Sequence, residues 1–139
     1  DLISSDINDI KKMMDINLYS VFNICKYSPK ILASSSNKSI INMLTPYAEN
    51  PVAGVCAYSS SKAALLNLSK SMAIEFEKYC IRVNSIMTDT IDTPVNRQEM
   101  PNANFSKWIK PIQIFNAIEM LIAKESKFIN GEIIKLSNE

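Results

Sequence analysis

Helical and extended segments alternate along this chain, and this alternation limits the fold more than any other sequence feature. Residues 6–33, 57–79 and 112–123 have helical character, whereas residues 39–45, 81–87 and 131–136 are short, mostly apolar runs of strand length. A helix therefore separates each strand from the next. Because such alternation is the signature of a parallel sheet with covering helices, we predict an α/β fold with three visible parallel strands.

The first helical stretch carries an apolar stripe that contains one polar residue. Ser5 or Asp6 can cap this helix at its start. The stripe at helical spacing consists of Ile7, Ile10, Met14, Asn17, Val21 and Ile24. From the pattern alone, Asn17 is either a buried amide that satisfies backbone groups or a functional side chain.

Three polar side chains follow the first predicted strand, at the end where parallel sheets bind ligands. Thr45 ends this strand, and Tyr58 and Lys62 open the next helix. Because they are four residues apart, the phenol and the ammonium share one helix face. A nearby ammonium lowers a tyrosine pKa, so this pair can exchange a proton with a carbonyl or alcohol oxygen. The alternative is a half-buried Tyr58 beside a solvated Lys62.

The composition excludes several kinds of site. The chain has no histidine, which removes Ser–His and Cys–His pairs and histidine-ligated metals. Its three cysteines, Cys25, Cys56 and Cys80, form no paired motif, so we expect neither a metal site nor a disulfide framework. The net charge is +1 and no basic or long apolar run is present. We therefore expect no nucleic-acid partner, no membrane span and a cytoplasmic location.

Around Tyr58 the sequence resembles the short-chain dehydrogenase/reductase superfamily, over essentially the whole chain. The resemblance rests on Tyr58-Ser59-Ser60-Ser61-Lys62, on the spacing from Thr45 to Tyr58, and on residues 15–22, 81–86 and 90–94. The string from Asp92 to Trp108 is similar to that of dihydropteridine reductases and of some bacterial relatives. The resemblance implies the C-terminal half of a Rossmann-like, doubly wound parallel sheet, with residues 1–139 as a single partial domain.

The resemblance also implies catalytic roles. Tyr58 would be the general acid or base at the substrate oxygen, and Lys62 would lower the pKa of Tyr58. Thr45 would donate a hydrogen bond to the same oxygen, and Asn17 would order water in a proton relay behind Lys62. The implied activity is hydride transfer to or from a small carbonyl, alcohol or pterin-like substrate, in which the cofactor carries the hydride.

The implied cofactor is NAD or NADP, and the choice between them is not readable from these residues. Besides Tyr58, the cofactor-binding residues would be Lys62, at the nicotinamide ribose, and Ile91 and Thr93, at the nicotinamide carboxamide. The glycine-rich turn that grips dinucleotide phosphates is missing, because Gly54 and Gly131 are the only glycines. We therefore expect that the N-terminal phosphate-binding half lies outside this chain and that the chain alone is inactive.

Two substitutions depart from the family pattern, and one alternative function stays open. Thr45 stands where most members have serine, and Thr88-Asp89 stands where most have Pro-Gly. In the family, helices like 6–33 and 57–79 build a dimer interface, so we expect a homo-oligomer. The alternative function is a non-catalytic dimerising scaffold. The apolar set Met100, Phe105 and Trp108 would form either a substrate lid or anchors for the long stretch 88–111.

Overall fold

Three parallel strands form one sheet in the order β1-β2-β3. Their bounds are Ser39–Leu44 for β1, Arg82–Thr88 for β2 and Ile133–Leu136 for β3. β1 pairs with β2 from Ser39↔Arg82 to Leu44↔Met87, and β2 pairs with β3 from Ser85↔Ile133 to Thr88↔Leu136. These coordinates are a computed structural model that describes residues 2–138. The predicted α/β fold with a parallel sheet is confirmed.

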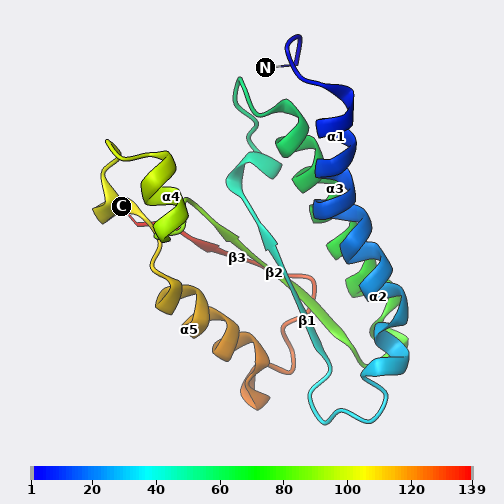
Figure 1. Ribbon diagram of the computed structural model, residues 1–139. Helices are drawn as coiled ribbons and strands as arrows, with labels where there is room; N and C mark the ends of the chain where they lie inside the picture. Colours follow the sequence, from blue (N-terminus) through cyan, green and yellow to red (C-terminus); the bar gives the residue numbers. More distant parts are fainter. Residues whose placement is uncertain (1, 139) are drawn as a thin grey trace.

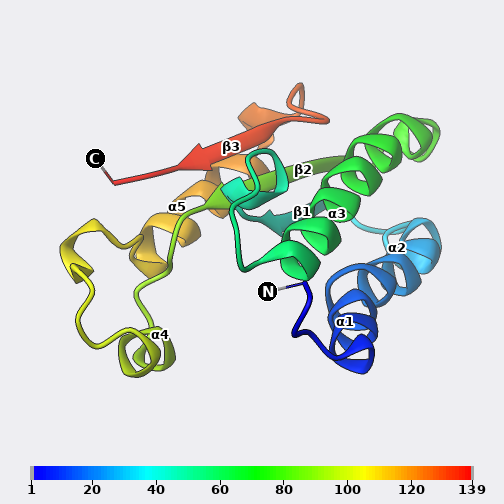
Figure 2. The same ribbon diagram turned by 90° about the horizontal axis from the view of Figure 1, so that it is seen from above.

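Helices cover both faces of this sheet. They are α1 (Ile7–Met14), α2 (Ser20–Ile31), α3 (Cys56–Glu75), α4 (Pro94–Glu99) and α5 (Pro111–Ile122). The first three lie together on one face of the sheet and α5 lies on the other, while α4 stands apart in the long stretch after β2 (Figures 1 and 2). Within residues 2–138, no helix is long and apolar enough to span a membrane.

Apolar side chains of β2 point alternately into two cores. Val83 packs with Met72 of α3 in the core between the sheet and the α2–α3 pair. Ile86 packs with Leu121 of α5 in the core on the opposite face. Val83, Ile86 and Leu121 are each fully buried. Because successive residues of a strand face opposite sides, this alternation explains why a mostly apolar strand lies at the centre of the sheet.

A π-helical turn at Asp15–Tyr19 joins α1 to α2 and changes which residues are buried. A π turn closes its hydrogen bonds one residue later than an α turn, so residues after it can depart from regular helical spacing. The stripe predicted at regular helical spacing includes Ile24, yet Ile24 is 68% exposed and Cys25 is 4% exposed. The prediction of a helix over 6–33 was right in extent. Its stripe was wrong at Ile24 and at Ile7, which is 58% exposed, whereas Val21 packs against the core as predicted.

The stretch between β2 and α5 contains the short helix α4, which was not predicted. Thr93 is the N-cap of α4, and its hydroxyl accepts a hydrogen bond from the Asn96 backbone N–H at 3.2 Å. Pro94 occupies the first helical position, where a missing N–H costs nothing. A threonine followed by proline is a helix-start signal, so the sequence did contain the information for this helix.

Polar and aromatic contacts hold the same stretch together. A parallel bridge joins Ile91 to Ile109 at its base. The Arg97 guanidinium binds both carboxylate oxygens of Asp92, at 2.6 and 2.9 Å, and lies 4.8 Å from the Phe105 ring centre. The Phe105 ring in turn packs against Trp108, which is 7% exposed. The burial of Trp108 fits the anchor alternative, and the substrate-lid alternative stays a prediction.

Candidate active site

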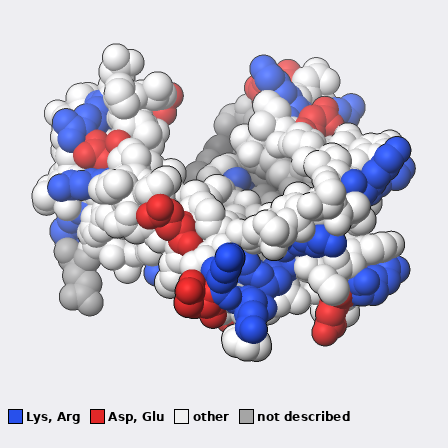
Figure 3. All heavy atoms as spheres, turned by 90° about the horizontal axis from the view of Figure 1, so that it is seen from below, with Lys and Arg blue, Asp and Glu red and all other residues white. Residues whose placement is uncertain are grey.

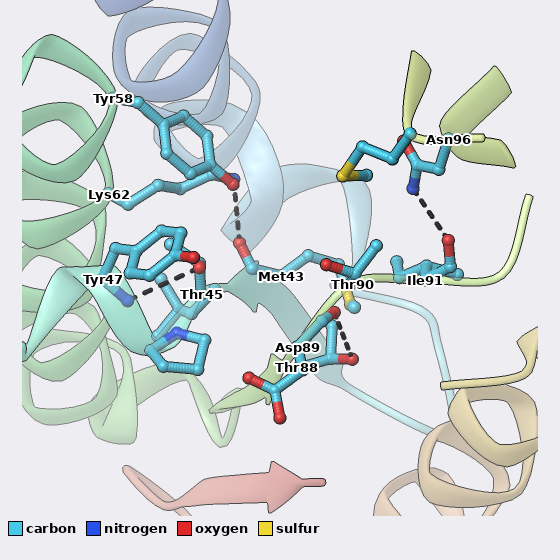
Figure 4. Close-up of a pocket in the computed structure, with 13 residues that line it drawn as sticks. Met43, Thr45, Tyr47, Tyr58, Lys62, Thr88, Asp89, Thr90, Ile91 and Asn96 are labelled. Carbon is cyan, nitrogen blue, oxygen red and sulfur yellow. Dashed lines mark hydrogen bonds between the residues drawn. The ribbon is translucent and has the colours of Figure 1, made fainter. Parts of the chain in front are cut away.

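A cavity of about 370 Å³ lies at the carboxyl ends of β1 and β2. Figure 4 shows Tyr58 and Lys62 from α3, Thr45 from the end of β1, and Thr90 and Ile91 after β2 around this space. The lining residues are Met43, Leu44, Thr45, Pro46, Tyr47, Tyr58, Lys62, Thr88, Asp89, Thr90, Ile91, Asn96 and Met100. The strand ends thus bring together groups that are far apart in the sequence, as open α/β sheets do.

The first turns of α3 place the phenol and the ammonium in the cavity. α3 begins at Cys56, so Tyr58 and Lys62 lie one turn apart on the same face. The Lys62 ammonium donates a hydrogen bond to the Met43 carbonyl of β1 at 3.1 Å. This bond ties the side chain of Lys62 to the sheet and leaves further N–H donors of the ammonium for a ligand.

Burial shifts the pKa values of both groups towards their neutral forms. Desolvation raises the pKa of Tyr58, the nearby Thr45 hydroxyl opposes this rise, and the Tyr47 phenol adds to it. Desolvation also lowers the pKa of Lys62. The net effect on Tyr58 is a raised pKa with burial as its largest cause, and the role of Lys62 in lowering that pKa stays a prediction.

Thr45 lies at the turn between β1 and the loop that leads to α3. It is 7% exposed and caps the short 3₁₀ turn Pro46–Ala48, where its hydroxyl accepts a long hydrogen bond, 3.5 Å, from the Tyr47 N–H. In Figure 4 the Tyr47 side chain reaches back over Thr45 on the cavity wall. The hydroxyl of Thr45 consequently has a fixed place beside Tyr58.

Asn17 lies in the π-helical turn and contacts α3 rather than the cavity. Its amide donates a hydrogen bond to the Ser61 hydroxyl at 3.0 Å, and this hydroxyl donates to the Tyr58 carbonyl at 2.8 Å. Ser61 is fully buried. The structure therefore links Asn17 to the backbone of Tyr58 through one side chain, at a π turn of the kind often found at functional sites.

The two residues predicted to contact nicotinamide are placed differently. Ile91 lines the cavity, and its carbonyl accepts a hydrogen bond from the Asn96 amide at 2.7 Å. Thr93 is not among the lining residues, and its hydroxyl caps α4. Asn96 lines the cavity in its stead, and this residue could be identified only once α4 was recognised.

The substituted pair Thr88-Asp89 also reaches the cavity. Thr88 is 6% exposed, and its hydroxyl donates a hydrogen bond to the Asp89 carbonyl at 3.0 Å. Asp89 is exposed and places a carboxylate on the cavity lining. Met100 lines the same cavity from the end of α4. Among residues 2–138, no cluster of His, Cys, Asp or Glu side chains could hold a metal ion.

Comparisons with known proteins identify the family. The profile of a family described as enoyl-(acyl carrier protein) reductase matches residues 1–137. The chain is 32% identical, over 128 residues, to 2,5-dichloro-2,5-cyclohexadiene-1,4-diol dehydrogenase LinX of Sphingobium indicum, an alignment that covers 86% of this chain and 51% of the relative. The chain belongs to the short-chain dehydrogenase/reductase superfamily.

Other members of the superfamily extend this result. A dihydropteridine reductase of Dictyostelium discoideum is 32% identical over 143 residues, which are 98% of this chain and 60% of that protein. The solved structure of a 4-hydroxyisoleucine dehydrogenase mutant with NADH and succinate has a TM-score of 0.88 at 28% identity, covering 99% of this chain and 61% of its own. The chain thus spans about half the length of the curated relatives it matches. The Rossmann-like character of the sheet is confirmed.

Proposed function

We propose that this chain is the catalytic half of an NAD(P)-dependent oxidoreductase that transfers hydride to or from a small carbonyl, alcohol or pterin-like substrate. The observation that carries the proposal is the common cavity of Thr45, Tyr58 and Lys62, at the carboxyl ends of two parallel strands, in a member of this superfamily. In this proposal a preceding half of the protein supplies the grip on the dinucleotide phosphates, and the bound nicotinamide supplies or accepts the hydride.

The proton chemistry falls to Tyr58. Since burial raises its pKa, the phenol carries its proton at neutral pH and can donate it to a substrate carbonyl oxygen as hydride arrives. Thr45, whose hydroxyl lies beside the phenol, donates a second hydrogen bond to the same oxygen. Lys62, held by the Met43 carbonyl, offers its other N–H groups to the ribose hydroxyls of the cofactor. Asn17 supports this arrangement through Ser61.

The test uses the protein expressed from the complete reading frame. NADH and NADPH are titrated while their fluorescence is followed, and turnover is measured on a panel of ketones, aldehydes and quinonoid dihydropterin. Because a general acid contributes about 10²–10⁴-fold to a rate, Tyr58→Phe should lower turnover by that factor. Tyr79→Phe, at an exposed tyrosine after α3, is the matched control and should retain full activity.

Two results would count against this proposal. Binding of neither NADH nor NADPH by the full-length protein would remove the cofactor on which the reaction depends. Equal turnover by wild type and Tyr58→Phe would remove the role of the phenol. Reading the coding sequence upstream of Asp1 is a simpler check, because the proposal requires a strand followed by a glycine-rich turn there.

A second function, dimerisation without catalysis, is favoured by the outer surface of the first helices. Six large apolar side chains there are between 52% and 68% exposed: Ile16, Tyr19, Phe22, Ile24, Tyr27 and Ile31. Exposed apolar surface of this extent marks an interface. We propose that this surface, together with α3, packs against a second copy of the protein. Light scattering gives the mass of wild type and of Phe22→Asp. The scaffold role would be favoured over catalysis if wild type is a dimer, Phe22→Asp is a monomer, and wild type shows no NAD(P)H-dependent turnover.

A further inference from the structure

A second concave surface, which we call the basic groove, lies at the opposite end of the sheet from Tyr58. It is formed where the strands begin, between the loop before β1, the loop from α3 to β2, and the segment from α5 to β3. Its open volume is about 1180 Å³. The lining residues are Ser35, Ser36, Asn37, Lys38, Glu77, Cys80, Ile81, Arg82, Ile122, Ala123, Lys124, Lys127, Phe128 and Asn130.

Positive charge is concentrated in the basic groove. Its lining contains four cations, Lys38, Arg82, Lys124 and Lys127, and one anion, Glu77, which gives a formal charge of +3 in a chain whose total is +1. Figure 3 faces this end of the molecule, and Lys and Arg atoms gather in the central lower part of the view with acidic atoms beside them. A concave surface of one sign attracts and holds an oppositely charged ligand.

The three lysines of the groove are available to such a ligand. Among the residues described, the two ion pairs are Arg97–Asp92 and Lys135–Glu49, and neither involves Lys38, Lys124 or Lys127. Arg82 has a different task, because its guanidinium donates to the carbonyls of Ser126 and Ile129, at 3.1 and 3.2 Å. It therefore fixes the wall of the groove while adding its charge.

An aromatic ring stands at the edge of this positive surface. Phe128 is 84% exposed, and the Lys127 ammonium lies 4.9 Å from its ring centre. A phenylalanine so exposed offers a flat face for stacking, and aromatic faces beside cations are the parts from which nucleotide-binding surfaces are built. Next to this ring, the Ile129 N–H donates a hydrogen bond to the Ser126 carbonyl at 2.9 Å, and across the groove the Asn37 amide donates to the Ile122 carbonyl at 2.6 Å.

We propose that the basic groove binds a nucleoside polyphosphate, with its phosphates on Lys38, Lys124 and Lys127 and its base on Phe128. The groove lies at the amino ends of the strands, whereas the proposed catalytic cavity lies at their carboxyl ends. The proposal is therefore independent of the oxidoreductase function, and either can fail without the other.

Two exposed cysteines allow the groove to be monitored directly. Cys80 lines the groove, while Cys56 begins α3 near the catalytic cavity. In the full-length protein, iodoacetamide alkylation of each cysteine is followed by peptide mass spectrometry at increasing ATP, without divalent cations. ATP should slow the alkylation of Cys80 and leave that of Cys56 unchanged. The buried Cys25 reports whether the fold opens during the reaction.

Variants test the charges and the ring separately. Because each exposed ion pair is worth about 0.2–1 kcal/mol and 1.4 kcal/mol is tenfold in affinity, the combined Lys38→Gln, Lys124→Gln and Lys127→Gln variant should need about tenfold more ATP for half-protection. Phe128→Ala should need about fivefold more ATP but the same amount of pyrophosphate, since stacking is worth about 1 kcal/mol or more. The charge-matched control is the combined Lys11→Gln, Lys12→Gln and Lys107→Gln variant, at three exposed positions outside the groove. It should need the same amount of ATP for half-protection as wild type.

Three outcomes would overturn the inference. If ATP does not protect Cys80, the groove is not a nucleotide site. If the triple glutamine variant of the groove matches wild type, or if its charge-matched control weakens protection equally, the groove lysines do not hold the phosphates. If Phe128→Ala leaves the ATP requirement unchanged, the base does not stack there and the assignment to a nucleoside is wrong.

Discussion

The hydrogen bond between Asn17 and Ser61 allows a quantitative test of how the first helix supports the candidate site. The Asn17 amide donates to the Ser61 hydroxyl at 3.0 Å, and Ser61 donates to the Tyr58 carbonyl at 2.8 Å. Asn17→Ala removes the first of these bonds, whereas Ser61→Ala removes both. The double variant contains neither partner, so the four proteins form a double-mutant cycle.

The geometry sets the size of the expected effects. A typical protein hydrogen bond contributes about 0.5–1.5 kcal/mol net. Asn17 is half-buried and water can partly replace its partner, so Asn17→Ala should lower the free energy of unfolding by about 1 kcal/mol. Ser61 is fully buried, and Ser61→Ala should cost about 1–2 kcal/mol because both bonds are lost. The coupling between the two sites should be about 0.5–1.5 kcal/mol.

The assay is urea denaturation of the full-length protein and its three variants, with the coupling calculated from their unfolding free energies. Turnover, or NADH affinity where turnover is absent, is measured on the same samples. If Asn17 positions Tyr58 through Ser61, the two single variants should lower turnover by similar factors. The turnover of the double variant should then be no lower than that of the less active single variant. Asn67→Ala, at an exposed position of α3, is the control for loss of an amide on a helix surface.

Additive stabilities within about 0.3 kcal/mol would refute the reasoning, because distant and independent sites add to that precision. Full coupling in stability with unchanged turnover would mean that the bond holds two helices together without affecting Tyr58. Lost turnover in Asn17→Ala alone, with Ser61→Ala active, would instead favour the proton relay that the family resemblance implies.

Three further predictions concern burial. Asn84→Ala should lower the free energy of unfolding by about 2–5 kcal/mol, because the fully buried amide bonds both the Ile129 carbonyl, at 2.9 Å, and the Glu132 N–H, at 3.0 Å; a urea midpoint equal to wild type would contradict this. Leu121→Ala should cost about 2–5 kcal/mol, since Leu121 is fully buried against the sheet, and calorimetry should show a lower Tm. The pKa of Tyr58 is raised in the folded protein. Its contribution to the free energy of unfolding is therefore fully present below a pH of about 10, the ordinary tyrosine pKa, and is lost as the pH rises towards the higher pKa of the folded protein. Difference absorbance between wild type and Tyr58→Phe should therefore show a phenol that ionises later than a free tyrosine.

Much of the fold was predictable because period and length are local properties of the sequence. The runs 39–45 and 81–87 became β1 and β2 within a residue of their predicted bounds, since mostly apolar runs of that length between helices indicate buried parallel strands. The π-helical turn was not predictable from apolar spacing. Its effect is visible only in the side chains after it, where Cys25 is buried in place of Ile24.

The side chains that form the candidate site were predictable from the sequence, whereas the contacts made by backbone groups were not. Tyr58 and Lys62 follow from a spacing of four on a helix, and both reach the cavity. The acceptor of the Lys62 ammonium is the Met43 carbonyl, and a carbonyl has no sequence signature. The hydroxyl of Thr93 accepts the capping hydrogen bond of α4, a role that the Thr-Pro pair indicates, and its contact with nicotinamide stays a prediction.

The pKa shifts of Tyr58 and Lys62 connect the packing of α3 to the direction of the proposed chemistry. Burial raises the pKa of Tyr58 and lowers the pKa of Lys62, so the phenol keeps its proton at neutral pH. One N–H of Lys62 is bound to the Met43 carbonyl, which holds the nitrogen against β1. An acid kept in its neutral form beside the Thr45 hydroxyl can donate a proton to an oxygen that becomes negative, whereas it must first lose that proton to act as a base. In the proposed function, the protonated phenol would therefore donate its proton to a carbonyl oxygen during reduction, and the reverse reaction would require the phenol to lose that proton.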